Sequence, residues 1–141
     1  MKPTSYTYNP LQRPLEALFV FLLGAVLCFW LQLLLFTDPL WILAPAGGIG
    51  LYLVYRINRL YPRTSLGVRA LLGACLLTLI QLFTGCIVNL GMGLSVWDYS
   101  TFPYQFLGQI CLPISLLYFF LCFPLALICY LIRRHVFLCD A

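Results

Sequence analysis

The chain has 141 residues, of which 63% are apolar and only 9% are charged. Soluble domains are about 45–50% apolar and about 25% charged, so this composition excludes a water-soluble globule and predicts a protein of the lipid bilayer. The net charge of +4 comes from a few separate arginines and not from a basic face, which argues against nucleic-acid binding.

The predicted elements are transmembrane helices, because roughly 20 residues at 1.5 Å each cross the hydrocarbon core of about 30 Å. In chain order, the uncharged stretches predict four spans at about 15–37, 39–55, 67–96 and 103–132. The second is the shortest and suits an upright or re-entrant helix. Predicted helix starts are Pro14, Asp38-Pro39, Ser65 and Thr101-Phe102-Pro103. The sequence therefore predicts an all-α polytopic membrane protein with terminal tails at 1–13 and 135–141.

The basic residues predict an orientation. All eight precede the first span, lie between the second and third, or follow the fourth: Lys2, Arg13, Arg56, Arg59, Arg63, Arg69, Arg133 and Arg134. The two other loops contain none. The positive-inside rule then places both termini in the cytoplasm, with the protein in the cell membrane.

Polar residues inside a membrane are the first candidates for a functional site, because leaving them unpaired is costly. They are Gln32, Gln81, Thr84, Asn89, Gln109 and Ser115. Asn89 and Gln109, the latter about four residues into the fourth helix, are predicted to meet near the outer leaflet. Gln81 is predicted to lie deeper, near the level of Ser115 or below it. The alternative is that these amides only hold adjacent helices together.

Three prolines fall inside the predicted spans, namely Pro45, Pro113 and Pro124. Each would remove an intrahelical bond and free the carbonyl four residues earlier, which for Pro113 is that of Gln109. We expect a polar focus at this level of the fourth helix.

The second span has small residues four apart, at Ala44 and Gly48 and again at Ala46 and Gly50. Such a face lets another helix backbone approach closely. The partner is either another helix of the same chain or a second copy in a homo-oligomer.

No catalytic or metal-binding constellation is found in the sequence. The single histidine, His135, is on the predicted cytoplasmic tail, whereas Asp98 is in the outer loop. The seven cysteines lack metal-ligand spacing and are read as small apolar residues, although Cys139 could carry an acyl chain. A P-loop is absent. We expect neither an enzyme nor a cofactor. Asp98 either orders its turn or presents a carboxylate at the mouth of a pathway.

Four segments of the second half resemble one family of small membrane proteins: QLFTG from Gln81, VWDYS from Val96, FPY from Phe102 and GQICL from Gly108. They are similar to the ABC-transporter type IV (CmpB-like) permease family, most specifically in W-D-Y-S. The resemblance implies a multi-helix membrane fold and a role in transport. Its matched positions are Trp97, Asp98, Tyr99 and Gly108. Two positions depart from the family pattern, since Gln81 replaces its usual acid and Gln105 its usual asparagine.

The first functional hypothesis is therefore a permease-like membrane subunit of unknown substrate, which needs oligomerisation or a partner ATPase. The loop bearing Arg56, Arg59, Arg63 and Arg69 is the candidate contact for that ATPase. Alternatively these arginines only set topology and touch anionic lipid. The second hypothesis is a non-transporting structural or regulatory membrane protein that binds other helices or lipids. A small multidrug-type exporter is a third hypothesis. Those exporters resemble each other in a mid-helix glutamate, whereas the only glutamate of this chain, Glu16, is at the edge of the first span.

Overall fold

The computed structural model describes residues 12–35 and 41–136, so Asp38-Pro39, Lys2 and Cys139 lie outside the described residues. The four long elements are helices: α1 (Gln12–Leu35), α2 (Ala44–Leu60), α3 (Leu66–Gly85) and α4 (Leu112–Leu131). A 3-10 turn, η1 (Trp41–Leu43), precedes α2. Two π-helical segments, η2 (Cys86–Gly91) and η3 (Ile132–Val136), extend α3 and α4.

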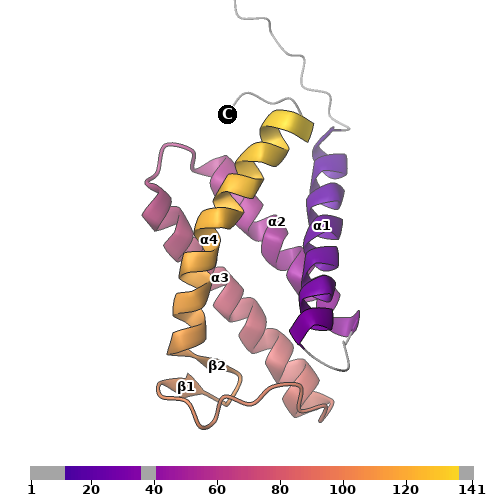
Figure 1. Ribbon diagram of the computed structural model, residues 1–141, viewed down its shortest axis with the longest axis vertical. Helices are drawn as coiled ribbons and strands as arrows, with labels where there is room; N and C mark the ends of the chain where they lie inside the picture. The colour runs from indigo at the N-terminus through magenta and orange to yellow at the C-terminus, as the bar shows by residue number, and fades with distance from the viewer. Residues whose placement is uncertain (1–11, 36–40, 137–141) are drawn as a thin grey trace, which may run out of the picture.

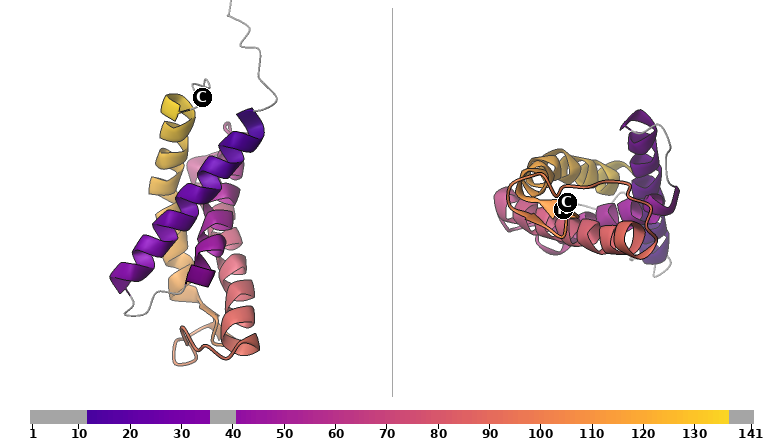
Figure 2. Two further views of the ribbon diagram at one scale, coloured as in Figure 1. Left: turned by 90° about the vertical axis from the view of Figure 1, so that its right-hand side faces the viewer. Right: turned by 90° about the horizontal axis from the view of Figure 1, so that it is seen from below.

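The helices run up and down, so that each is antiparallel to its neighbour in the chain (Figure 1). The start of α1, the α2–α3 turn and the end of α4 lie toward one end of the bundle. The start of α2, the end of α3 and a small hairpin lie toward the other. We call these the arginine end and the hairpin end, after the residues described below. Helix α2 is central and packs against α1, α3 and α4, whereas α1 stands to one side and has its main contacts with α2 (Figure 2).

Three described segments are long and apolar enough to cross a membrane: Pro14–Leu34, Leu66–Gly91 and Leu112–Val136. The predicted helical architecture is confirmed, and three of the four predicted spans have helices long and apolar enough to cross a membrane. Helix α2 has 17 residues and falls short of the spanning length. It is the most enclosed helix, because Val54 and Tyr55 are each only 1% exposed. The central core lies along α2 and combines residues of this helix with residues of its neighbours: Val20, Leu51, Val54, Tyr55, Ala70, Cys122, Cys129 and Ile132.

Glycines allow α2 to lie this close to its neighbours. A Cβ atom on Gly48 would lie 2.8 Å from the carbonyl oxygen of Phe21 in α1, and one on Gly50 would lie 2.9 Å from Leu77 in α3. Both glycines are buried. Of the two predicted uses of the small-residue face, packing within the chain is therefore confirmed at Gly48 and Gly50. A homo-oligomer through these two positions would require the bundle to open.

We expect Gly48→Ala to destabilise the bundle by about 1–3 kcal/mol, because the new methyl group meets the Phe21 ring and the Phe21 carbonyl oxygen, a backbone atom that cannot turn aside. Gly67, near the start of α3, is a matched control, since a Cβ atom there meets nothing within 4 Å. Gly67→Ala should leave stability unchanged or raise it by up to about 1 kcal/mol. Thermal unfolding in mild detergent measures both, and equal effects would contradict the packing argument.

The predicted bounds of the third and fourth spans are wrong at the hairpin end. Helical structure after Leu66 stops at Gly91 rather than 96, and α4 begins at Leu112 rather than 103. Between them an antiparallel pair, β1 (Gln105–Phe106) and β2 (Ile110–Cys111), forms a short hairpin with Gln105 opposite Cys111. Positive φ angles at Tyr104 and Leu107 are incompatible with a continuing right-handed helix.

The observed helix bounds decide whether each proline is in a first turn or in a helix interior. Pro45 and Pro113 stand in the first turn of α2 and α4, where the missing N–H group costs nothing, so neither interrupts a helix. Pro124 is inside α4, as predicted. The predicted cap of the third helix is also confirmed, because the Ser65 hydroxyl accepts a hydrogen bond from the Val68 N–H group at 3.4 Å.

Candidate functional site

At the hairpin end, Asn89 joins η2 to the loop and the hairpin. Its Nδ2 group donates to Gln109 Oε1 at 2.7 Å and to the Trp97 carbonyl at 3.0 Å. Its Oδ1 atom accepts from the Val96 N–H group at 2.7 Å. The predicted meeting of Asn89 and Gln109 is confirmed, although Gln109 belongs to the hairpin and not to a helix. We call Asn89, Trp97 and Gln109 the hairpin network.

Gln109 completes this network. It donates from Nε2 to the Leu107 carbonyl at 3.1 Å, and its own carbonyl accepts from Trp97 Nε1 at 3.1 Å. Gly85 faces the Gln109 side chain so closely that a Cβ atom there would collide with Oε1. Asn89 and Gln109 are 8% and 4% exposed. Their hydrogen-bonding groups are thus used within the chain, and the hairpin network fastens the hairpin to the end of α3.

The W-D-Y-S segment shapes the adjoining turn. Asp98 Oδ1 accepts from the Ser100 N–H group at 2.8 Å, which is the Asx-type turn that the sequence allowed. The Tyr99 N–H group donates to the Gly108 carbonyl at 2.8 Å. Gly108 has φ +68°, and a Cβ atom on it would lie 2.9 Å from Asp98 Oδ1. The matched positions Asp98, Tyr99 and Gly108 therefore hold the loop against the hairpin.

Gln81 lies deeper in α3 and is separate from the hairpin network. Its Nε2 group approaches the Tyr99 hydroxyl at 3.5 Å, and its Oε1 atom is buried without a hydrogen-bond partner in the part of the chain that the structure describes. Ser115 does not pair with Gln81, because its hydroxyl accepts from Thr78 at 3.1 Å. The Thr78–Ser115 pair is thus a side-chain hydrogen bond between α3 and the first turn of α4.

Acidification tests the role of Asp98. Hydrogen bonds from the Ser100 backbone and hydroxyl hold the pKa of Asp98 below its ordinary value of 3.8. Because folding lowers the pKa of Asp98, its ionised carboxylate stabilises the fold at pH values above its pKa in the unfolded chain. This stabilisation is lost as the pH falls through its pKa in the folded protein. We expect loop protection, measured by hydrogen exchange, to decline below about pH 4 in the wild type. Asp98→Asn should remove this decline, and a decline of the same size in both would contradict the assignment.

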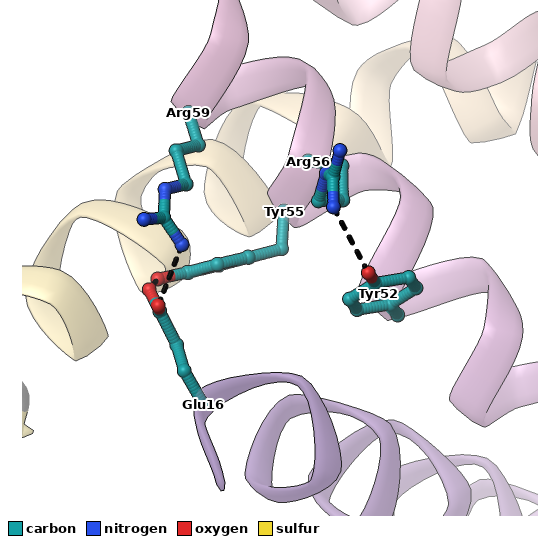
Figure 3. A network of polar contacts seen from close by, with 5 residues as sticks. All are labelled: Glu16, Tyr52, Tyr55, Arg56 and Arg59. Atoms are coloured by element: carbon teal, nitrogen blue, oxygen red, sulfur yellow. Dashed lines mark hydrogen bonds and ion pairs between the residues drawn. The ribbon is translucent and has the colours of Figure 1, made fainter. Parts of the chain in front are cut away.

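At the arginine end, Glu16 of α1 points into the bundle toward two side chains of α2 (Figure 3). The Tyr55 hydroxyl donates to Oε1, and Arg59 forms an ion pair with Oε2 at 2.6 Å. Glu16 is 3% exposed, whereas the Arg59 side chain is 27% exposed. A buried carboxylate is stable here because both oxygens are paired. We call these three residues the arginine-end network.

Sequence reasoning missed this network, since it placed Glu16 at the edge of the first span and Arg59 in a loop that contacts an ATPase or lipid. The available signal was the spacing of Tyr55 and Arg59, which are four apart and so share one face of a helix. A second pair lies beside it. Arg69 donates to Asn58 Oδ1 at 3.1 Å, and Asn58 in turn donates to the Val54 carbonyl at 2.9 Å.

The four predicted contact arginines therefore separate into two kinds. Arg59 and Arg69 bind side chains that hold α1, α2 and α3 together. Arg56 and Arg63 are exposed. Within the described residues, Arg56 donates to the Tyr52 hydroxyl one turn earlier, at 3.2 Å, and its guanidinium lies 5.9 Å from the centre of that ring.

A recess of about 190 Å³ opens beside the arginine-end network, between α1 and α2. Its walls are Glu16, Ala17, Tyr52, Tyr55, Arg56, Arg59 and Leu60. Within residues 12–35 and 41–136, no group of three histidine, cysteine or acidic side chains is placed to hold a metal ion. The recess instead brings two guanidinium groups and a tyrosine hydroxyl to one surface.

These features define a multi-pass helical membrane protein whose two ends are fastened by separate polar networks. The family model described as "Putative ABC-transporter type IV" matches residues 23–139, and the chain belongs to this family. The match includes the W-D-Y-S segment and so confirms the resemblance drawn from it. No match to the chain is found among curated proteins or among solved structures.

Proposed function

We propose that the chain is a non-enzymatic membrane subunit of an ABC-type transport system, in which a separate cytoplasmic ATPase supplies the energy. The observation that carries this proposal is the family match over residues 23–139, which includes most of the bundle. The absence of a P-loop from the sequence agrees with an ATPase on another chain. The substrate class is left open.

The distribution of charge supports a cell-membrane location with both termini in the cytoplasm. The arginines lie in the last turns of α2, in the α2–α3 turn and at the end of α4. These segments belong to the same end of the bundle (Figure 1). No basic residue is found in the sequence of the hairpin end. By the positive-inside rule the arginine end faces the cytoplasm. In this arrangement α2 is the fourth membrane helix, shielded from lipid over much of its length by the other three.

The buried polar groups support a need for a further chain. Glu16 and Asn58 lie at the arginine end, and Asn89 and Gln109 belong to the hairpin end. Between them, the polar side-chain contact of the described α3–α4 interface is the Thr78–Ser115 pair. In the described part of one copy these polar groups form separate clusters, so we infer that a transport pathway would form between copies or against a larger partner.

The α2–α3 turn is the best placed surface for the ATPase. It is short and exposed, and it presents Arg63 at the end of the bundle. Arg59 and Arg69 are unsuited to a docking test, because their substitution would disturb the bundle itself. Arg63→Glu is the informative change.

The test is purification from native membranes in mild detergent, with mass spectrometry of the proteins that accompany the tagged chain. We expect an ATPase with the wild type and with Arg134→Glu, a charge-matched control at the end of α4. Arg63→Glu should lose it. Recovery of the chain without an ATPase, or equal retention by both variants, would overturn the proposal.

A non-transporting structural or regulatory protein is the second candidate. The hairpin network favours it, because the amide oxygens of Asn89 and Gln109 both accept hydrogen bonds within the chain and are not free to bind a substrate. The same purification distinguishes the two, since this candidate predicts membrane-protein partners without an ATPase.

A further inference from the structure

The recess between α1 and α2 has an excess of positive charge. Glu16 and Arg59 neutralise each other within it, at 2.6 Å. Arg56 has no carboxylate partner among the described residues, and its hydrogen bond to Tyr52 leaves most of its five N–H groups available. A cation would have to displace Arg59 or Tyr55 from a carboxylate whose two oxygens are already bonded. The recess is therefore suited to a singly charged anion.

Its size indicates what part of a ligand enters. At about 190 Å³ the recess is smaller than the roughly 300–1,000 Å³ typical of sites for drug-sized molecules. It can take a headgroup-sized fragment. Arginine is the side chain that best recognises phosphate, because its planar fork donates two parallel hydrogen bonds. Arg56 and Tyr52 both line the recess, and the Tyr52 hydroxyl and the Arg56 guanidinium lie side by side, joined by a hydrogen bond (Figure 3).

Exposed leucines line the recess or are next in sequence to residues that line it. Leu60, which forms part of its wall, is 57% exposed, and Leu15 and Leu18 of α1 are 60% and 54% exposed. Ala17, a small residue, lines the recess on the α1 side. A ligand with a phosphate group and attached acyl chains would satisfy both the arginine and these leucines, whereas free phosphate would satisfy only the arginine.

We propose that this recess binds the phosphodiester headgroup of an anionic phospholipid in the leaflet at the arginine end. Arg56 and Tyr52 contact the phosphate, and Arg59 adds positive charge while it keeps Glu16 paired. Basic pockets between membrane helices are a common form of headgroup site. Lipid binding at this site does not require an ATPase, so the proposal can be tested independently of the transport function.

The test measures lipid binding to the purified full chain by native mass spectrometry in mild detergent. The probes are phosphatidylglycerol and phosphatidylcholine with identical acyl chains. For the first bound lipid, we expect the wild type to prefer phosphatidylglycerol by about tenfold. Arg56→Gln, a change at an exposed side chain, should abolish this preference.

Arg134 provides a closely matched control. It donates to the Tyr130 hydroxyl one turn earlier, at 3.1 Å, just as Arg56 donates to Tyr52 at 3.2 Å, but it does not line the recess. Arg134→Gln removes the same charge from the same end and should keep the preference. An equal loss in both variants would show general attraction to basic side chains and would overturn the site.

Two further measurements distinguish binding inside the recess from binding to the surface around it, and binding of a whole lipid from binding of its headgroup alone. Ala17→Leu fills the recess without changing any charge and should also abolish the preference; unchanged binding would overturn the proposal. Glycerophosphoglycerol, which lacks acyl chains, should fail to displace phosphatidylglycerol at equal concentration. Efficient displacement would overturn the proposal of a lipid ligand and indicate that the recess binds a free phosphodiester.

Discussion

Arg59→Met is expected to destabilise the bundle more than Glu16→Gln, although the two changes break the same ion pair. Removing Arg59 leaves a carboxylate that is 3% exposed without its counter-charge, whereas removing the charge of Glu16 leaves an arginine that is 27% exposed and can turn to water. Losing one partner of a buried pair costs about 3–5 kcal/mol. We expect about 3 kcal/mol for Arg59→Met and about 1 kcal/mol for Glu16→Gln, whose amide still accepts from Tyr55.

The measurement is the free energy of unfolding in mild detergent for both single variants and the double variant. The double variant should be more stable than the sum of the single effects predicts. With glutamine at position 16, the loss of Arg59 no longer leaves a buried carboxylate without its counter-charge. Arg56→Met is the control, since Arg56 is on the same helix without a carboxylate partner in the described chain. If Arg59→Met and Arg56→Met had equal effects, the arginine-end network would not stabilise the fold.

Asn89→Leu is expected to detach the hairpin from α3. The leucine would leave the Trp97 carbonyl, the Val96 N–H group and Gln109 Oε1 without the hydrogen bonds that Asn89 makes. Each buried group left unpaired costs about 1–3 kcal/mol, and partial rescue by water should bring the total to about 3 kcal/mol. The effect should be local, because the α1–α2 interface shares no hydrogen bond with this network.

Hydrogen exchange followed by mass spectrometry measures this change segment by segment. Peptides covering residues 92–111 should exchange faster in Asn89→Leu, whereas peptides from α1 and α2 should be unchanged. Thr84→Val is the control, because it removes a hydroxyl from the same helix without altering the hairpin network and nearly preserves shape. Faster exchange throughout the chain, or the same pattern in Thr84→Val, would contradict the local role of Asn89.

Hydropathy and capping were sufficient to predict most of the helical architecture. The apolar runs predicted the helices, and Ser65 marked the start of α3 correctly. The hairpin was missed because an apolar run including Ile110 and Cys111 has the same hydropathy in a helix as in a strand. Pro113 was also ambiguous, since a proline signals either the interior kink or the first turn of a helix. Its role became clear only with the observed start of α4.

The candidate sites were partly predictable. Asn89 and Gln109 were predicted to meet from their expected depth along two helices, and they do meet, although Gln109 lies in the hairpin before α4 begins. Glu16 and Arg59 are 43 residues apart, and their contact depends on how α1 crosses α2. That crossing is set by backbone contact at Gly48 and its neighbours. Sequence spacing contains no such information about a contact between two separate helices.

The sequence by itself determined that this protein belongs in a membrane, that it is helical, and that its positive charges are confined to particular segments. These properties depend on the transfer energies of individual side chains, which sum along the chain and need no knowledge of neighbours. The tertiary structure decided that Arg59 and Arg69 hold the bundle together while Arg56 and Arg63 are exposed. The physical reason is that a hydrogen bond or an ion pair forms only over a few ångströms, so helix crossing, and not composition, selects its partners.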